Sequence, residues 1–305
     1  MKTELLIYNP DMTARFRYIA EWMFMDVLGV GVEFTSDRDT VLNPTLPVLN
    51  YSVERVGNEP FIRACGLLES SALELPEVIP VPFRGSSGLF PSSHDSLMPF
   101  DPFAACFFTI TRMEEYFATE RDEHGRFRHD QSVLVSMGVS GKPIANIWCR
   151  FLADSLKEVY PSLVFPIMPF RFLPTIDIDN AYAYAGKSIM RNLGSAFRQM
   201  GVMGVSGFTE RLKVLMGQMS DPYDTYDYLL SHFKGHEQDV RFFFHLGDRS
   251  RFDTPVSWRS RRFRNLVRTI HRHFQSGIHP SCLASLDTGP ETMLKEKQRF
   301  VTITG

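Results

Sequence analysis

Short apolar runs and longer stretches of helical spacing alternate along the first part of the chain. Three of the short runs are typical of buried strands: residues 5–8, 30–34 and 47–51. Between the first two runs, Phe16, Ile19 and Met23 fall at helical spacing. This pattern predicts a helix over residues 14–28, which Gly29 ends. A strand, a helix and a further strand in this order indicate an α/β module.

The rest of the first half is less regular. Residues 79–102 are rich in Pro, Gly and Ser, and we expect them to form a long loop. Helices are predicted over residues 103–117 and 144–159. We therefore expect residues 1–165 to form an accessory α/β module of unknown function.

After Pro161 the pattern changes to strands that alternate with helices. Strands are predicted at residues 172–179, 240–246 and 276–279, and helices at residues 187–216, 224–233, 258–274 and 288–302. Thr288 and Glu291 have the spacing of a capping box at the start of the last helix. This alternation favours a parallel sheet or a barrel over residues 166–305.

Composition limits the class of protein. The chain has 305 residues, of which 44% are hydrophobic and 22% are charged, and this excludes wholesale disorder. A formal net charge of −2 argues against a general polyanion binder, so no nucleic-acid partner is expected. No apolar stretch approaches the roughly 18 residues of a membrane span. The four cysteines are scattered and include no CxxC pair, which favours reduced thiols in a cytoplasmic protein.

Polar side chains stand at the carboxyl ends of the three strands predicted in the second half. They are Asp177 and Asp179, then His245, then His279 with Ser281. Active sites of parallel α/β folds lie at such strand ends, so these side chains can converge at one rim. The two Asp residues share one face of a strand, where a divalent cation would relieve their repulsion. The alternative is that the Asp residues cap the following helix and that His279 is a turn or core histidine.

Three motifs in this order resemble the polysaccharide deacetylase family, the NodB-homology group of carbohydrate esterase family 4. They are residues 175–180 (TIDIDN), 242–248 (FFFHLGD) and 277–281 (GIHPS). The resemblance covers residues 173–305. The first half, through residues 112–116 (RMEEY) and 122–127 (DEHGRF), resembles an uncharacterised module found ahead of such deacetylase domains in bacterial proteins.

The resemblance implies a distorted (β/α) barrel, of which this chain would hold the first part, with a metal bound by one Asp and two His. Applied to this sequence, the resemblance implies that Asp177 is the catalytic base and that Asp179 and His279 bind a divalent metal, with Zn²⁺ as the first candidate. Leu283 stands where the family has its second metal-binding His. Three side chains could replace that ligand: His245, Ser281 and Ser285.

The implied reaction is the metal-assisted hydrolysis of an N-acetyl or O-acetyl group on a bacterial polysaccharide or glycan precursor, so the expected partner is an acetylated glycan. The family's later motifs would supply an Arg beside the base and a His general acid. The chain stops at Gly305 before either motif, so we expect it to be a fragment of a longer protein.

The alternative is a catalytically inactive, deacetylase-like protein that binds an anionic glycan, lipid or nucleic acid. Its binding surface would be the arginines of the helix predicted at 258–274, which otherwise form a solvated outer face. They are Arg259, Arg261, Arg262, Arg264, Arg268 and Arg272.

Overall fold

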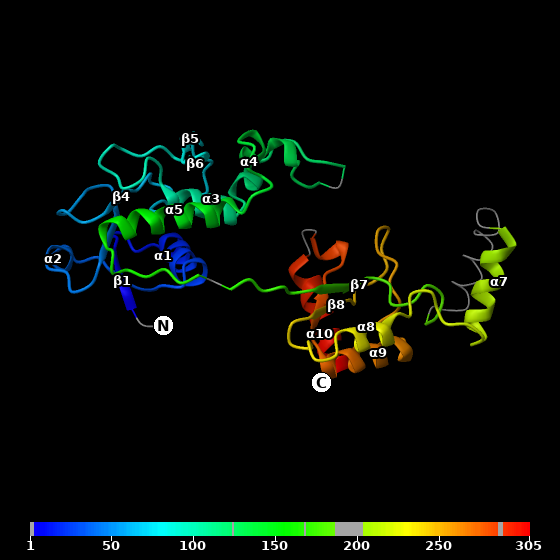
Figure 1. Ribbon diagram of the computed structural model, residues 1–305. Helices are drawn as coiled ribbons and strands as arrows, with labels where there is room; N and C mark the ends of the chain where they lie inside the picture. Colours follow the sequence, from blue (N-terminus) through cyan, green and yellow to red (C-terminus); the bar gives the residue numbers. More distant parts are fainter. Residues whose placement is uncertain (1–2, 124, 168, 187–203, 286–288) are drawn as a thin grey trace. The chain divides into compact units, whose positions relative to one another are not determined.

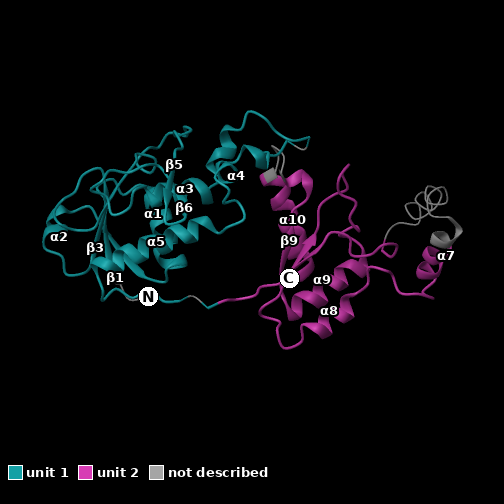
Figure 2. Cartoon of the chain, turned by 45° about the horizontal axis from the view of Figure 1, so that its top comes forward, with its two compact units in different colours: residues 1–169 teal, residues 170–305 magenta. Residues whose placement is uncertain are grey.

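The chain forms two compact units, Met1–Pro169 and Phe170–Gly305, shown in different colours in Figure 2. The computed structural model describes residues 3–123, 125–167, 169–186, 204–285 and 289–305. The sequence places the division between residues 165 and 166. Each unit is a mixed α/β structure that contains a parallel sheet, as the alternation of strand and helix patterns predicts.

The first unit contains a four-stranded parallel sheet in the order β2-β1-β3-β4. Its strands are β1 (Thr3–Tyr8), β2 (Gly31–Thr35), β3 (Val48–Ser52) and β4 (Phe61–Arg63). All residues of β3 are buried, as is usual where both faces of a parallel sheet are covered. The three predicted strands are therefore confirmed, and β4 joins them although three residues are too few for periodicity to reveal.

Helices of the first unit cover both faces of this sheet. They are α1 (Ala14–Glu21) with a π-helical turn (Trp22–Val27), α2 (Arg38–Leu42), α3 (Pro102–Ile110), 3-10 turns at Met113–Phe117 and His129–Gln131, α4 (Val133–Ser136) and α5 (Ile144–Val159). The larger core lies between the sheet and α1, α3 and α5, and Tyr51 and Phe103 meet there with ring centroids 4.5 Å apart. Helix α2 covers the other face. The helix expected over residues 103–117 is interrupted at Arg112, whose φ of 52° is left-handed.

The long loop expected over residues 79–102 is wrong in part, because it contains a hairpin. Strands β5 (Pro80–Phe83) and β6 (Ser86–Leu89) pair antiparallel around the turn at Arg84 and Gly85, both of which have positive φ. Gly88 is needed for packing, since a Cβ there would lie 2.3 Å from Cγ of Phe100. The Pro and Gly residues that suggested a loop therefore serve short strands and a tight turn.

The second unit contains a three-stranded parallel sheet in the order β7-β8-β9. Its strands are β7 (Thr175–Ile178), β8 (Arg241–His245) and β9 (Gln275–His279), and its helices are α7 (Gly204–Leu215), α8 (Tyr226–His232), α9 (Arg261–His273), the 3-10 turn Cys282–Ser285 and α10 (Gly289–Thr304). Within the described part of this unit the sheet does not close into a barrel. Residues 187–203 of one predicted helix, and Thr288 of the predicted capping box, lie outside the described residues.

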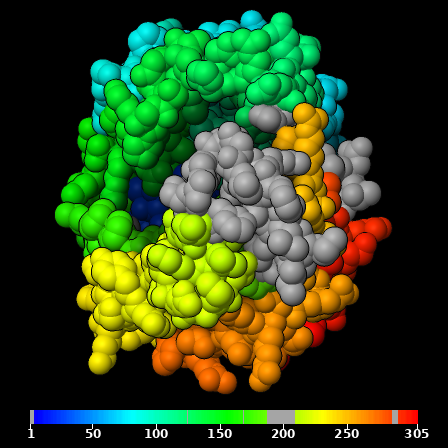
Figure 3. All heavy atoms as spheres, turned by 90° about the vertical axis from the view of Figure 1, so that its right-hand side faces the viewer, coloured from blue at the N-terminus to red at the C-terminus, as the bar shows by residue number. Residues whose placement is uncertain are grey.

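The two faces of this sheet have different surroundings. Ile178, Phe242 and Phe244 are buried on one face, in a core shared with α9 and α10. Because side chains alternate along a strand, Asp177, His245 and His279 share the opposite face. Helices α8 and α9 lie side by side, as the yellow and orange segments show (Figure 1, Figure 3). Asp177, His245 and His279 are therefore on the face of the sheet opposite the one that carries Ile178, Phe242 and Phe244.

Candidate functional site

Strand register brings the polar ends of β7, β8 and β9 to one edge of the sheet. Ile178 pairs with Phe244, and His245 pairs with His279. Since all three strands run in the same direction, Asp179, one residue after β7, reaches the same edge as His245 and His279. The site is therefore placed by hydrogen bonding between strands whose residues are far apart in the sequence.

The imidazole of His279 lies near both carboxylates of the β7 end. Its Nδ1 is 3.0 Å from Oδ1 of Asp179, and its Nε2 is 3.8 Å from Oδ2 of Asp177. The side chains of Asp177, Asp179 and His279 are 52%, 67% and 36% exposed, so all three are accessible to a ligand. Asp177 and Asp179 also line a surface pocket of about 420 Å³ together with Tyr223 and Thr225.

His245 and Ser281 have different surroundings from this trio. His245 is only 4% exposed, and its Nε2 lies 3.4 Å from Oδ1 of Asp253. Its ring centroid is 6.2 Å from that of His279. Ser281 is also 4% exposed, and its backbone N–H donates to Oε2 of Glu296 at 3.2 Å. The structure thus brings together Asp177, Asp179 and His279, while His245 and Ser281 are buried beside them.

A buried carboxylate that the sequence analysis missed holds the segment after Asp179. Four backbone N–H groups donate to Asp221: those of Ala183, Tyr184, Ala185 and Tyr223. Burial by itself would raise the pKa of Asp221, but these four hydrogen bonds outweigh it and lower the pKa below its ordinary value of 3.8. The Asp-Pro dipeptide at 221–222 is a turn signal that could have drawn attention to this residue.

The metal that the family resemblance implies is not matched by a full set of ligands. A catalytic zinc ion usually has three protein ligands. Among the described residues no group of three or more His, Cys, Asp or Glu side chains is placed to hold an ion. Asp179 and Nδ1 of His279 supply two donor atoms on one side of the imidazole. Asp177 lies near Nε2, on the other side of the ring, so its carboxylate does not complete the same set of ligands. Of the expected replacements, His245 and Ser281 are buried as described above, and the side chain of Ser285 lies outside the described residues.

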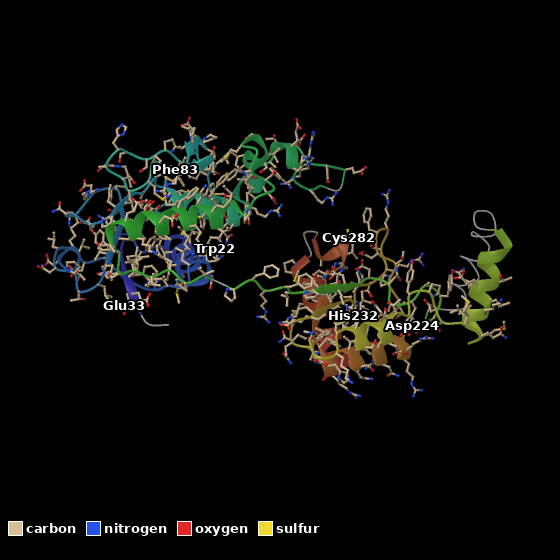
Figure 4. All side chains as sticks on the ribbon, in the orientation of Figure 1. Trp22, Glu33, Phe83, Asp224, His232 and Cys282 are labelled. Carbon is tan, nitrogen blue, oxygen red and sulfur yellow. The ribbon has the colours of Figure 1, made fainter. Side chains whose placement is uncertain are left out.

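The arginines of α9 are expected from the sequence to form a solvated outer face, and Arg261, Arg262 and Arg272 are exposed, whereas Arg264 and Arg268 are partly buried. Arg262 lies 2.8 Å from Oδ2 of Asp224, which Figure 4 labels, and its guanidinium is 4.5 Å from the ring centroid of Tyr182. Arg268 donates from Nε to the carbonyl of Ile303 at 2.8 Å. These side chains therefore hold α9 to its neighbours.

These observations define a two-unit α/β protein with an acidic, histidine-containing rim in its second unit. Residues 5–161, just over half of the chain, match a family of unknown function (DUF7033), and the chain belongs to this family. This match lies within the first unit. Comparisons with curated proteins and with solved structures gave no match. In the described part of the chain, no helix is long and apolar enough to cross a membrane.

Proposed function

We propose that the second unit is a hydrolase that removes N-acetyl or O-acetyl groups from a bacterial polysaccharide or glycan precursor. The observation that carries this proposal is the placement of His279 beside both Asp177 and Asp179 at the carboxyl edge of a parallel sheet. The order of the three deacetylase-like motifs along the chain also supports it. On the same grounds we propose that β7, β8 and β9 belong to a (β/α) barrel whose inner face carries these residues.

Asp177 is the proposed general base. Its side chain is half-exposed and lines the pocket beside β7, so a water molecule and an acetyl group can approach it together. The water oxygen bonds to the acetyl carbonyl carbon as its proton passes to Asp177. The bond from that carbon to the sugar nitrogen or oxygen then breaks, and the leaving group takes the proton from Asp177. Acetate and the deacetylated glycan are the products.

Asp179 and His279 have a supporting role in this proposal. Asp179 lies 3.0 Å from Nδ1 on one side of the imidazole, and Nε2 on the other side lies near Asp177. Dependence on Zn²⁺ or another divalent metal stays a prediction, because the described residues offer two donors where three are expected.

The test is acetate release from acetylated chito-oligosaccharides and from acetylated xylan, with added Zn²⁺ or with a chelator. Asp177→Asn should lower the rate roughly 10²–10⁴-fold while any bound metal is retained. Asp179→Asn should lose both rate and metal. Asp227→Asn is the matched control, because Asp227 is an exposed carboxylate on the nearby α8. Full activity in both rim variants would refute the assignment.

A catalytically inactive protein that binds an anionic glycan, lipid or nucleic acid is the alternative, and the two-donor rim is the observation that favours it. It predicts no acetate release under any metal condition, together with salt-sensitive binding of an anionic ligand. Two arginines of α9 are already held within the unit, which argues against that helix as the binding surface.

A further inference from the structure

We propose that Glu296 is a positioning residue that fixes the orientation of the His279 imidazole through the turn at Pro280 and Ser281. The inference rests on the proposed function, because orientation matters only if His279 takes part in chemistry. Glu296 lies on α10 and is 1% exposed. Its Oε2 accepts the backbone N–H of Ser281, two residues after His279, at 3.2 Å. The carboxylate thus holds the chain just beyond the site.

A second buried contact holds the next residue of the same turn. Oδ2 of Asp253, in the segment between β8 and α9, accepts the backbone N–H of Cys282 at 2.9 Å. Figure 4 labels Cys282. The other oxygen of Asp253 lies 3.4 Å from Nε2 of His245, which pairs with His279 across the sheet. Two carboxylates from different elements therefore hold two successive N–H groups after β9.

Helix α10 also holds the end of β8, one turn beyond Glu296. Arg299 donates from Nη1 to the carbonyl of Leu246 at 2.8 Å and from Nη2 to Asp248 at 2.7 Å. Between these contacts lies Gly247, where an added Cβ would be 2.5 Å from Cβ of Ser281 and 2.8 Å from Oε1 of Glu296. The segments that follow β8 and β9 are therefore closely packed against each other, and side chains of α10 contact both of them.

A purely structural role would not call for a carboxylate at this position. Burying a charged group is costly, and Oε1 of Glu296 has no hydrogen-bond partner among the described residues. Glu296→Met would leave the buried Ser281 N–H without its acceptor, so a loss of stability is expected in addition to any effect on His279. What the carboxylate adds is a fixed acceptor for the Ser281 N–H, and that contact leads to His279.

The test compares Glu296→Met, which keeps the volume but removes the acceptor, with Glu296→Gln, which keeps an acceptor oxygen. Gln298→Met, at an exposed position on the same helix, is the control. The measurement is the ¹⁵N shifts of the two His279 ring nitrogens in full-length, histidine-labelled protein, assigned with His279→Gln. In Glu296→Met the two shifts should move toward each other, because a ring that can turn exposes each nitrogen to both environments, and the two tautomers become more equally populated by proton exchange. The rate of acetate release should fall roughly 10–100-fold, as small misplacements do, with KM little changed.

Restoration of both readouts in Glu296→Gln, with no change in Gln298→Met, supports the proposal. Unchanged His279 shifts in Glu296→Met overturn it. If the shifts respond as expected but the wild type releases no acetate, the proposed function fails and the positioning role stands. If Glu296→Met does not fold, the test is the hydrogen-exchange rate of the Ser281 N–H in the wild-type protein. Rapid exchange of this N–H overturns the proposal, and protection from exchange supports it.

Discussion

Replacing Asp221 with Asn is expected to loosen the segment that follows Asp179. Four backbone N–H groups donate to the Asp221 carboxylate at distances of 2.7–3.0 Å: those of Ala183, Tyr184, Ala185 and Tyr223. The side chain is 3% exposed, so these donors have no ready replacement from water. Asp221 is thus the common acceptor for a loop at the edge of the candidate site.

The size of the effect follows from the number of bonds lost. An amide has one acceptor oxygen, so Asn can keep two of the four bonds and presents its NH₂ group to the other two donors. A hydrogen bond to a charged group contributes about 1.5–3 kcal/mol. Losing two therefore costs roughly 3–6 kcal/mol, before relaxation, out of the roughly 5–15 kcal/mol that stabilises a typical protein.

The effect should depend on pH in a defined direction. The pKa of Asp221 is lower in the folded protein than its ordinary value of 3.8. Its stabilisation is therefore complete above the unfolded pKa and is lost as the pH falls through the lower, folded pKa. Asp221→Asn should lower stability most near neutral pH, and the difference from wild type should shrink once the wild-type carboxyl is protonated.

The assay is hydrogen exchange of peptides covering residues 181–186, followed by urea unfolding at several pH values. Faster exchange in these peptides, with peptides of the first unit unchanged, is the expected result. Asp227→Asn, which changes an exposed carboxylate, should alter stability by no more than about 0.5 kcal/mol. Equal stability of Asp221→Asn and wild type at neutral pH would refute the reasoning.

Two further substitutions test the packing of the second unit. Arg262→Glu should destabilise this unit by roughly 1–2 kcal/mol in urea unfolding, because it places a carboxylate beside Asp224. Arg261→Glu, at an exposed position, should leave the stability unchanged, and equal effects of the two substitutions would contradict the role given to Arg262. Gly247→Ala should cost about 1–3 kcal/mol, because its Cβ would lie 2.5 Å from Cβ of Ser281, and a thermal midpoint equal to wild type would show that the turn can move.

Most of the strands could be predicted because their signal is local. Phe242 and Phe244 lie in a short apolar run typical of a buried strand, and the spacing of Asp177 and Asp179 places them on one face. Parallel pairing follows from the helices that separate the strands. The β5–β6 hairpin was missed, because its Pro and Gly content is shared by loops and tight turns.

The residues that hold the site could not be predicted, because their partners are backbone groups distant in sequence. Asp221 accepts from Ala183, 38 residues earlier, and Glu296 accepts from Ser281, 15 residues earlier. A backbone N–H is present at every non-proline position, so the sequence carries no mark of which one is bound. Burial of the carboxylate is the informative property, and it appears only once the fold is known.

The sequence alone does not distinguish the roles of four carboxylates near the rim, but their environments divide them into an exposed pair and a buried pair. Asp177 and Asp179 are more than half exposed and have the His279 ring beside them, so their oxygens remain accessible to a ligand. Asp221 and Glu296 are at most 3% exposed, and each accepts backbone N–H groups of a segment that follows the site. For Asp221 these hydrogen bonds lower the pKa and so favour the ionised form, which makes its carboxylate a poor base. Amide substitutions should therefore change chemistry at the exposed pair and the order of the adjoining segments at the buried pair.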